Sequence, residues 1–222
     1  MKPLLLRQLS SDRVPRFIIL LVAIIAELML APIFSGSVLG MDAARVVTAL
    51  LLFATLSAVG MRPAILVLFV PAIAWHLLDA YWAGTAVHVE ALTVRILFFS
   101  YATGLIVWHV MHRSDVTIDT IAGAACAYTL LAVVWGQLYL LLEVLRPGSF
   151  DIPAHWRTVA SGDPGPALLY FSFITMTTVG YGDITPQWAG AAGLAAAEAV
   201  VGQLYLAVTI ARLVGLHISR RT

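Results

Sequence analysis

The sequence predicts an all-α membrane protein with six transmembrane helices and one shorter apolar segment between the fifth and the sixth. Of its 222 residues, 61% are hydrophobic and only 11% are charged, whereas soluble domains average about 25% charged residues. Six apolar stretches are long enough to cross a hydrocarbon core about 30 Å thick, since a helix rises 1.5 Å per residue. The net charge of +1 provides no basic field, so we expect no nucleic-acid partner.

The expected spans are bounded by loops that contain most of the charged and proline residues. They cover residues 17–34, 44–60, 64–82, 91–111, 121–144 and 188–216. With this spacing, membrane lipid is the expected solvent for their outer faces. We expect three parts along the chain: an N-terminal segment at 1–16, a four-helix transmembrane domain at 17–113, and a second domain at 114–222 that contains the remaining spans. Residues 114–119 are expected to form a connecting helix between the two domains.

The distribution of basic residues predicts the orientation, because Lys and Arg collect in short cytoplasmic loops. If the N-terminus is inside, only Arg45, Arg146 and Arg157 lie outside, and Arg95 lies within the fourth span. The other nine basic residues then lie on or near the inside: Lys2, Arg7, Arg13, Arg16, Arg62, Arg113, Arg212, Arg220 and Arg221. We therefore expect a multi-pass protein of the plasma (inner) membrane with both termini in the cytoplasm.

The short apolar run at 166–179 is too short to span the membrane and has the length of a re-entrant segment. It ends at Gly180, and Gly182 follows two residues later. Non-helical backbone at membrane depth is tolerated only where it is buried in protein or lines a wet cavity, so the loop predicts a pore or a binding site. Glycine reaches positive φ without steric cost. The loop can therefore present successive carbonyl oxygens in single file to a cation such as K⁺.

Thr178, Val179, Gly180, Tyr181 and Gly182, followed by Asp183, match the TVGYGD selectivity filter of the potassium-channel superfamily. Residues 121–216 resemble the outer helix, pore helix, filter and inner helix of these channels. The resemblance implies a homotetramer in which Thr178 to Tyr181 supply the oxygens that bind K⁺. It also implies that K⁺ is the transported ion, that no other cofactor is needed, and that the protein is not an enzyme.

Four residues are expected to support the filter: Thr177, Asp183, Tyr170 and Phe171. Many members of the superfamily have two tryptophans where this chain has Tyr170 and Phe171, and Phe171 cannot donate the hydrogen bond that the second one makes to the filter tyrosine. Some bacterial members have a glutamate where this chain has Ile174. We expect these departures to affect the rigidity of the filter more than its selectivity, and Phe171→Trp to alter its kinetics.

In the expected inner helix, Gly202 resembles the gating hinge of the superfamily, and a packing glycine is the alternative. If it is a hinge, residues Gln203, Leu206, Ile210 and Val214 are expected to line the cavity and the inner gate. Glu198 is an ionisable residue inside a membrane helix and is therefore a functional candidate. It either lines the cavity, where it would concentrate cations, or is protonated and hydrogen-bonded to the pore helix beside Thr175 or Thr177.

Within the first four spans, the candidates for an intramembrane ion pair are Glu27, Asp79 and Arg95. A voltage sensor needs several basic residues at every third position of its fourth helix, because one charge contributes only about 2.3 kcal/mol per 100 mV. This chain has Phe98 and Tyr101 at those positions. We therefore expect a degenerate sensor-like bundle with weak or no voltage dependence, in which Arg95 pairs with Glu27 or Asp79.

These observations favour a channel that passes K⁺ passively across the plasma membrane. Two alternatives are a non-conducting regulatory subunit of a larger potassium channel and a potassium transporter subunit, although the latter class has four pore loops per chain. A third is a membrane-embedded enzyme that uses His109, His112 and Glu198, for which the sequence offers no nucleophile or complete set of metal ligands.

Overall fold

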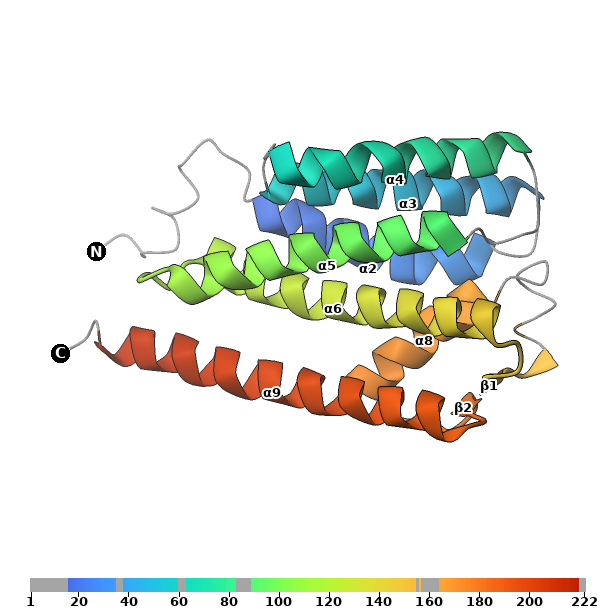
Figure 1. Ribbon diagram of the computed structural model, residues 1–222. Coiled ribbons are helices and arrows are strands. Elements are labelled where there is room, and N and C mark those ends of the chain that lie inside the picture. The colour runs from blue at the N-terminus through green and yellow to red at the C-terminus, as the bar shows by residue number, and fades with distance from the viewer. Residues whose placement is uncertain are drawn as a thin grey trace.

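Helices occupy all six stretches in which the sequence predicts a span. The computed structural model describes residues 16–34, 38–59, 63–82, 89–154, 156 and 164–219. The helices lie side by side, with α3 and α4 at one edge of the molecule and α9 at the other (Figure 1). Their bounds are α2 (Arg16–Phe34), α3 (Val38–Val59), α4 (Pro63–Trp82), α5 (Val89–His112), α6 (Ile118–Leu145), α8 (Gly165–Met176) and α9 (Ala189–Ser219).

Three of these helices are long and apolar enough to cross a membrane by length and composition: Val89–His112, Ile118–Leu145 and Ala189–Leu216. In α2, α3 and α4 the apolar stretches found among the described residues are shorter, at 10–17 residues. The protein is therefore mostly helical with three candidate spans in the part of the chain that the structure describes. The full set of six spans stays a prediction.

Two boundaries differ from the expected ones. Helix α3 begins at Val38, six residues before the expected span, because Asp42 and Arg45 lower the hydropathy of this turn but do not oppose helix formation. The expected connecting helix at 114–119 is wrong. Residues 113–117 are not helical, and α6 begins at Ile118 with Thr117 as its N-cap.

The N-cap of α6 is a reciprocal capping box. The Thr117 hydroxyl accepts a hydrogen bond from the Thr120 backbone N–H at 3.1 Å, and the Thr120 hydroxyl accepts one from the Thr117 N–H at 3.4 Å. Two of the backbone donors that a helix start leaves unpaired are thereby satisfied. The chain consequently turns sharply after α5, and α6 packs back against it.

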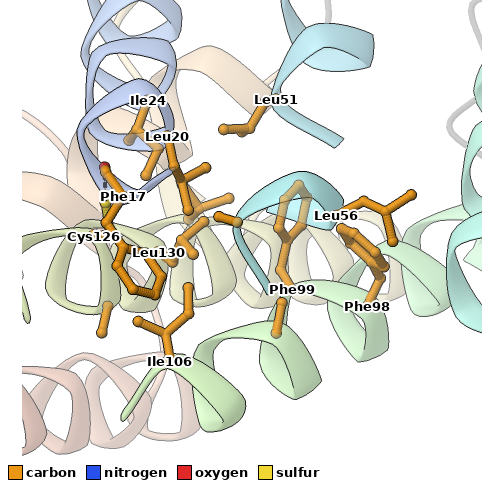
Figure 2. Close-up of a cluster of buried hydrophobic side chains, with 14 of the residues drawn as sticks. Phe17, Leu20, Ile24, Leu51, Leu56, Phe98, Phe99, Ile106, Cys126 and Leu130 are labelled. Carbon is orange, nitrogen blue, oxygen red and sulfur yellow. Dashed lines mark hydrogen bonds between the residues drawn. The ribbon is translucent and has the colours of Figure 1, made fainter. Parts of the chain in front are cut away.

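One hydrophobic core joins α2, α3, α4, α5 and α6. The labelled side chains of Figure 2 come from α2, α3, α5 and α6 and lie together in this core. The Cys126 thiol of α6 donates a hydrogen bond to the Phe17 carbonyl of α2 at 3.0 Å. The core therefore crosses residue 114, where the sequence analysis divides the chain into two domains, and that division stays a prediction.

The chain returns to one end of the molecule between α6 and α9. Strand β1 (Phe150–Asp151), just after α6, pairs antiparallel with β2 (Thr185–Pro186), just before α9. Helix α8 and the loop after it lie between the two strands in sequence, so this segment leaves and re-enters the same end (Figure 1). The start of α2 and the end of α9 lie at the opposite end (Figure 1).

Hydrogen bonds fix the strand pair against the end of α6. The Glu143 carboxylate accepts from the backbone N–H groups of Gly148 at 2.8 Å and Phe150 at 3.1 Å. The Trp188 indole N–H donates to the Ser149 hydroxyl at 3.2 Å. These contacts hold the start of α9 beside the end of α6. They thereby fix the two ends of the segment that contains α8 and its loop.

Candidate functional site: the α8 loop and its supports

Helix α8 is a 12-residue helix, about 18 Å long at 1.5 Å per residue, which is too short to cross a membrane. Its N-cap is Pro164 and a second proline follows in its first turn, where the missing N–H costs nothing. Asp163, a residue type that often caps helices, lies outside the described residues. The helix ends at Met176, earlier than the expected end at 179.

The loop at 177–183, called the filter loop after its predicted role, turns its first amides back onto α8. The backbone N–H groups of Val179 and Gly180 both donate to the Ile174 carbonyl, at 2.9 and 3.1 Å. The described chain has no cis peptide bond, and in a trans peptide the C=O points opposite to the N–H. The carbonyl oxygens of Thr178 and Val179 therefore point away from α8.

Positive φ angles occur at alternate positions of the loop: 61° at Thr178, 53° at Gly180 and 76° at Gly182. Alternating left- and right-handed residues make successive peptide groups face the same way, as in the anion-binding nests formed by N–H groups. The two glycines adopt this conformation without penalty, which agrees with the role predicted for them. Thr178 is the only positive-φ residue other than glycine in the described chain. Its left-handed backbone ends α8 before Val179.

The outer side of the loop is open. Residues Thr177 to Asp183 are exposed, and Tyr181 exposes 73% of its surface and Val179 51%. The space around Gly180 and Gly182 is also empty, since nothing lies within 4 Å of a Cβ built on either. Within one chain, the groups expected to bind an ion thus face away from the protein.

Tyr170 and Asp183 form a direct support for the loop. The Tyr170 hydroxyl donates to the Asp183 carboxylate at 2.9 Å, and the other carboxylate oxygen accepts from the Ile184 N–H at 3.1 Å. The Trp156 ring packs on the Tyr170 ring, with centroids 5.0 Å apart. The two residues expected to support the filter, Tyr170 and Asp183, are thereby brought together, and they tie the end of the loop to the middle of α8.

Phe171 and Thr177 have other surroundings. Phe171 is buried, and its ring packs edge-on against those of Tyr139 and Phe150, with centroids 5.2 and 5.4 Å away. It therefore anchors α8 to α6 and β1. The Thr177 hydroxyl donates to the Phe173 carbonyl of α8 at 2.6 Å, and the same carbonyl accepts the Thr177 backbone N–H at 3.0 Å.

Glu198 is fully buried between three helices. One carboxyl oxygen accepts from the Tyr139 hydroxyl of α6 at 2.5 Å, and the other is hydrogen-bonded to the Ser172 hydroxyl of α8. The Ser172 hydroxyl also lies 2.7 Å from the Ala132 carbonyl. The expected partners Thr175 and Thr177 are not used. Of the two alternatives for Glu198, the structure favours a carboxyl hydrogen-bonded to the pore helix.

Sequence reasoning missed Ser172 and Tyr139. The signal that could have found them is their position as polar side chains within the apolar helices α8 and α6. A hydroxyl in such a helix needs a partner, and a buried carboxyl in a third helix supplies one for both.

Gly202 lies where α9 crosses the end of α8. A Cβ built on Gly202 would be 2.8 Å from the Met176 Cγ and 3.1 Å from the Met176 carbonyl oxygen. The same carbonyl accepts a hydrogen bond from the Tyr128 hydroxyl of α6 at 3.0 Å. Gly202 therefore serves as a packing residue, and its role as a hinge stays a prediction.

Only one stripe of α9 is buried, formed by Ala191, Glu198, Gly202 and Thr209. In the most apolar window of α9, 11% of the residues are buried, against 50% in α6. Gln203, Ile210 and Val214, three of the residues predicted to line a cavity, are exposed on other faces, while Leu206 is half-buried. The exposed faces of α9 are available for lipid, water or other copies of the chain.

The predicted pair of Arg95 with Glu27 or Asp79 is not tested, because the side chains of Glu27 and Asp79 lie outside the described residues. The residues of the enzyme alternative are not brought together. His109 and His112 lie at the end of α5, where they contact Arg113 at 3.2 Å and the Trp108 carbonyl at 2.8 Å. Among the described residues, no group of three His, Cys, Asp or Glu side chains could hold a metal ion.

Comparison with known proteins identifies one family. The model of a family described as Ion channel matches residues 153–217. The match supports an ion channel. It covers α8, the filter loop and nearly all of α9, and it argues for a channel rather than an enzyme. No curated protein and no solved structure matches the chain.

Proposed function

We propose that the protein is a potassium-selective channel that conducts K⁺ passively as a homotetramer. In this proposal Thr178, Val179, Gly180 and Tyr181 supply the oxygens that replace the water shell of K⁺. Residues 114–222 form the pore domain and 17–113 form a sensor-like bundle with weak or no voltage dependence. The chain crosses the plasma (inner) membrane six times with both termini, including residues 1–16, in the cytoplasm, and K⁺ is cargo rather than cofactor.

The observation that carries the proposal is the backbone of the filter loop. The amides of Val179 and Gly180 are bound to the Ile174 carbonyl, and positive φ recurs at every second residue from Thr178 to Gly182. This combination supports a column of outward carbonyls. Neutral oxygens of this kind can compensate for the lost hydration of K⁺ without binding it too tightly to leave.

The exposed carbonyls of a single chain support the proposed tetramer. Peptide carbonyls exposed to hydrocarbon cost several kcal/mol each, and one loop presents only one side of a cation site. Four loops around an axis would complete the site and separate its carbonyls from the hydrocarbon of the membrane. The exposed faces of α9 would then face the axis, the neighbouring copies and lipid. The C-terminal ends of the four α8 helices would favour a cation in the centre.

Purified protein in liposomes tests the proposal. We expect K⁺ flux that exceeds Na⁺ flux by orders of magnitude without an added partner. Gly180→Ala should abolish it, because an L-residue at φ of 53° costs about 1–2 kcal/mol in each subunit. Gly104→Ala is the matched control, since nothing lies within 4 Å of a Cβ there. It should conduct as the wild type does.

Two results would count against the channel. Flux that appears only when a larger channel subunit is added would indicate a regulatory subunit. Flux that is equal for K⁺ and Na⁺ in wild type and Gly180→Ala would remove the role of the filter loop. Chemical crosslinking of the purified protein checks the tetramer separately. We expect bands of two, three and four linked chains and none of a larger size.

A further inference from the structure

We propose that Glu198 is protonated at neutral pH and acts as a positioning residue that locks the inner helix α9 to the pore helix α8 and the outer helix α6. The lock consists of Glu198, Ser172, Tyr139 and the Ala132 carbonyl. We infer its protonation from the arrangement of oxygen atoms around the carboxyl group. Its effect on the filter rests on the proposed function.

The number of available protons decides the protonation state. The Ser172 hydroxyl has one proton and two oxygen neighbours, the Ala132 carbonyl at 2.7 Å and the Glu198 carboxyl. A carbonyl can only accept, so the contact with Ala132 at 2.7 Å is a hydrogen bond only if the Ser172 proton lies on it. The contact between Ser172 and Glu198 is then a hydrogen bond only if Glu198 donates it.

The second carboxyl oxygen is consistent with this assignment. The Tyr139 hydroxyl also has one proton, which it donates to Glu198 at 2.5 Å. A protonated carboxyl therefore donates to Ser172 through one oxygen and accepts from Tyr139 through the other. An ionised carboxyl would instead accept the hydrogen bond of the Ser172 hydroxyl. The Ser172 and Ala132 oxygens would then face each other at 2.7 Å with no proton between them.

Among the described residues, the helices that pack most against α9 supply no positive charge that would keep Glu198 ionised. The helices packed against α9 are α6 and α8, and neither contains Lys, Arg or His. Two titratable residues of α6 interact with Glu198, Tyr139 through a hydrogen bond and Tyr128 without one, while Tyr170 of α8 is hydrogen-bonded to Asp183. On α9 itself, Arg212 lies fourteen residues further on, about 21 Å along the helix. An unpaired buried carboxylate is costly, and the neutral acid avoids that cost.

The lock has a second contact one turn further along. Ser172 and Met176 are four residues apart on α8, and Glu198 and Gly202 are four residues apart on α9, so Ser172 meets Glu198 and Met176 meets Gly202. The two helices thus share a continuous seam that ends at the first residues of the filter loop. A shift of α9 that breaks the bond to Ser172 would loosen the support under Thr177 and Thr178.

Infrared spectroscopy of the purified protein tests the protonation without any need for conduction. We expect the difference spectrum between wild type and Glu198→Gln at neutral pH to contain the carbonyl band of a protonated carboxylic acid. Ser172→Ala should shift this band, because it removes the acceptor of the acid proton. Glu90→Gln is the matched control, since Glu90 is exposed in the first turn of α5, and its difference spectrum should contain carboxylate bands only.

A spectrum with carboxylate bands only for Glu198 would overturn the proposal, and so would an acid band that Ser172→Ala leaves unmoved. If Glu198→Gln does not fold, Tyr139→Phe provides the same test, since it removes the hydrogen bond to the other carboxyl oxygen and should also shift the band.

Liposome flux tests the positioning role. Glutamine can donate to Ser172 and accept from Tyr139, so Glu198→Gln should keep K⁺ flux within about twofold of the wild type, whereas Glu198→Leu should lower it by at least about fivefold, the change in equilibrium expected for one lost hydrogen bond. Equal losses in both variants would mean that the charge itself matters, and would overturn the lock. If the wild type passes no K⁺, the proposed function fails, while the infrared result still decides the protonation.

Discussion

Gly202→Ala distinguishes a packing glycine from a hinge. The added methyl group would lie 2.8 Å from the Met176 Cγ and 3.1 Å from the Met176 carbonyl oxygen, whereas carbon atoms pack at about 3.5–4.0 Å. The Met176 side chain can move, but it is fully buried. Its carbonyl is held by the Tyr128 hydroxyl at 3.0 Å. The methyl group must therefore push α9 away from the end of α8.

Two opposing effects determine how much Gly202→Ala changes the free energy of unfolding. Overpacking of a tight contact costs about 1–3 kcal/mol, and replacement of glycine by alanine inside a helix returns about 1 kcal/mol. We expect Gly202→Ala to lower the free energy of unfolding by about 0–2 kcal/mol. Gly193→Ala, on the same helix with nothing within 4 Å of its Cβ, should raise it by up to about 1 kcal/mol.

A double-mutant cycle with Met176→Ala measures the contact. The shortened side chain removes the 2.8 Å clash, so the two substitutions together should cost less than the sum of their separate effects, by about 0.5–3 kcal/mol. Thermal unfolding in detergent and K⁺ flux are measured for all four proteins. A hinge predicts that Gly202→Ala changes flux regardless of Met176. Strict additivity in both assays would refute the packing account.

Three further substitutions probe separate contacts. Gly136→Ala should destabilise the protein by about 1–3 kcal/mol in thermal unfolding, because its Cβ would lie 3.0 Å from the Leu169 Cα, a backbone atom that cannot rotate away; an unchanged midpoint would contradict the close contact of α6 and α8. Tyr170→Phe removes the hydrogen bond to Asp183 and should lower the ratio of K⁺ to Na⁺ flux by up to about fivefold, and an unaltered ratio would mean that this bond does not support the filter. Thr117→Ala removes the N-cap of α6 and should cost about 1 kcal/mol in the same unfolding assay, with no change in selectivity.

The helices of this fold could be predicted well because long apolar stretches are visible in the amino-acid sequence. Each expected span contains a helix, and the errors lie at ends that hydropathy does not report. Thr117 and Thr120 start α6 through hydrogen bonds of their side chains. The positive φ of Thr178 ends α8. Both are matters of a single residue's geometry, to which an average over a window of twenty residues is insensitive.

The positive φ angles in the loop after α8 could be predicted from its glycines, whereas the binding of an ion by this loop stays a prediction. Gly180 and Gly182 are required by backbone angles, and these angles are observed. The contacts around Glu198 could not be predicted to the same degree. They depend on how α6, α8 and α9 are rotated about their axes, and the sequence contains several hydroxyls on these helices that could have been the partner. Tertiary packing selected Ser172 and Tyr139 over Thr175 and Thr177.

The division of polar groups between the two sides of α9 links the fold to the proposed function. The polar residue Glu198 lies on the one buried stripe, while apolar side chains such as Val200, Leu204 and Val208 are exposed. The filter loop has the reverse arrangement, since its amides face the protein and its carbonyls face outward. Apolar surface can be left to lipid, but peptide carbonyls cannot. The exposed carbonyls of the filter loop therefore need a polar partner. The partner proposed for them is a cation shared among four copies.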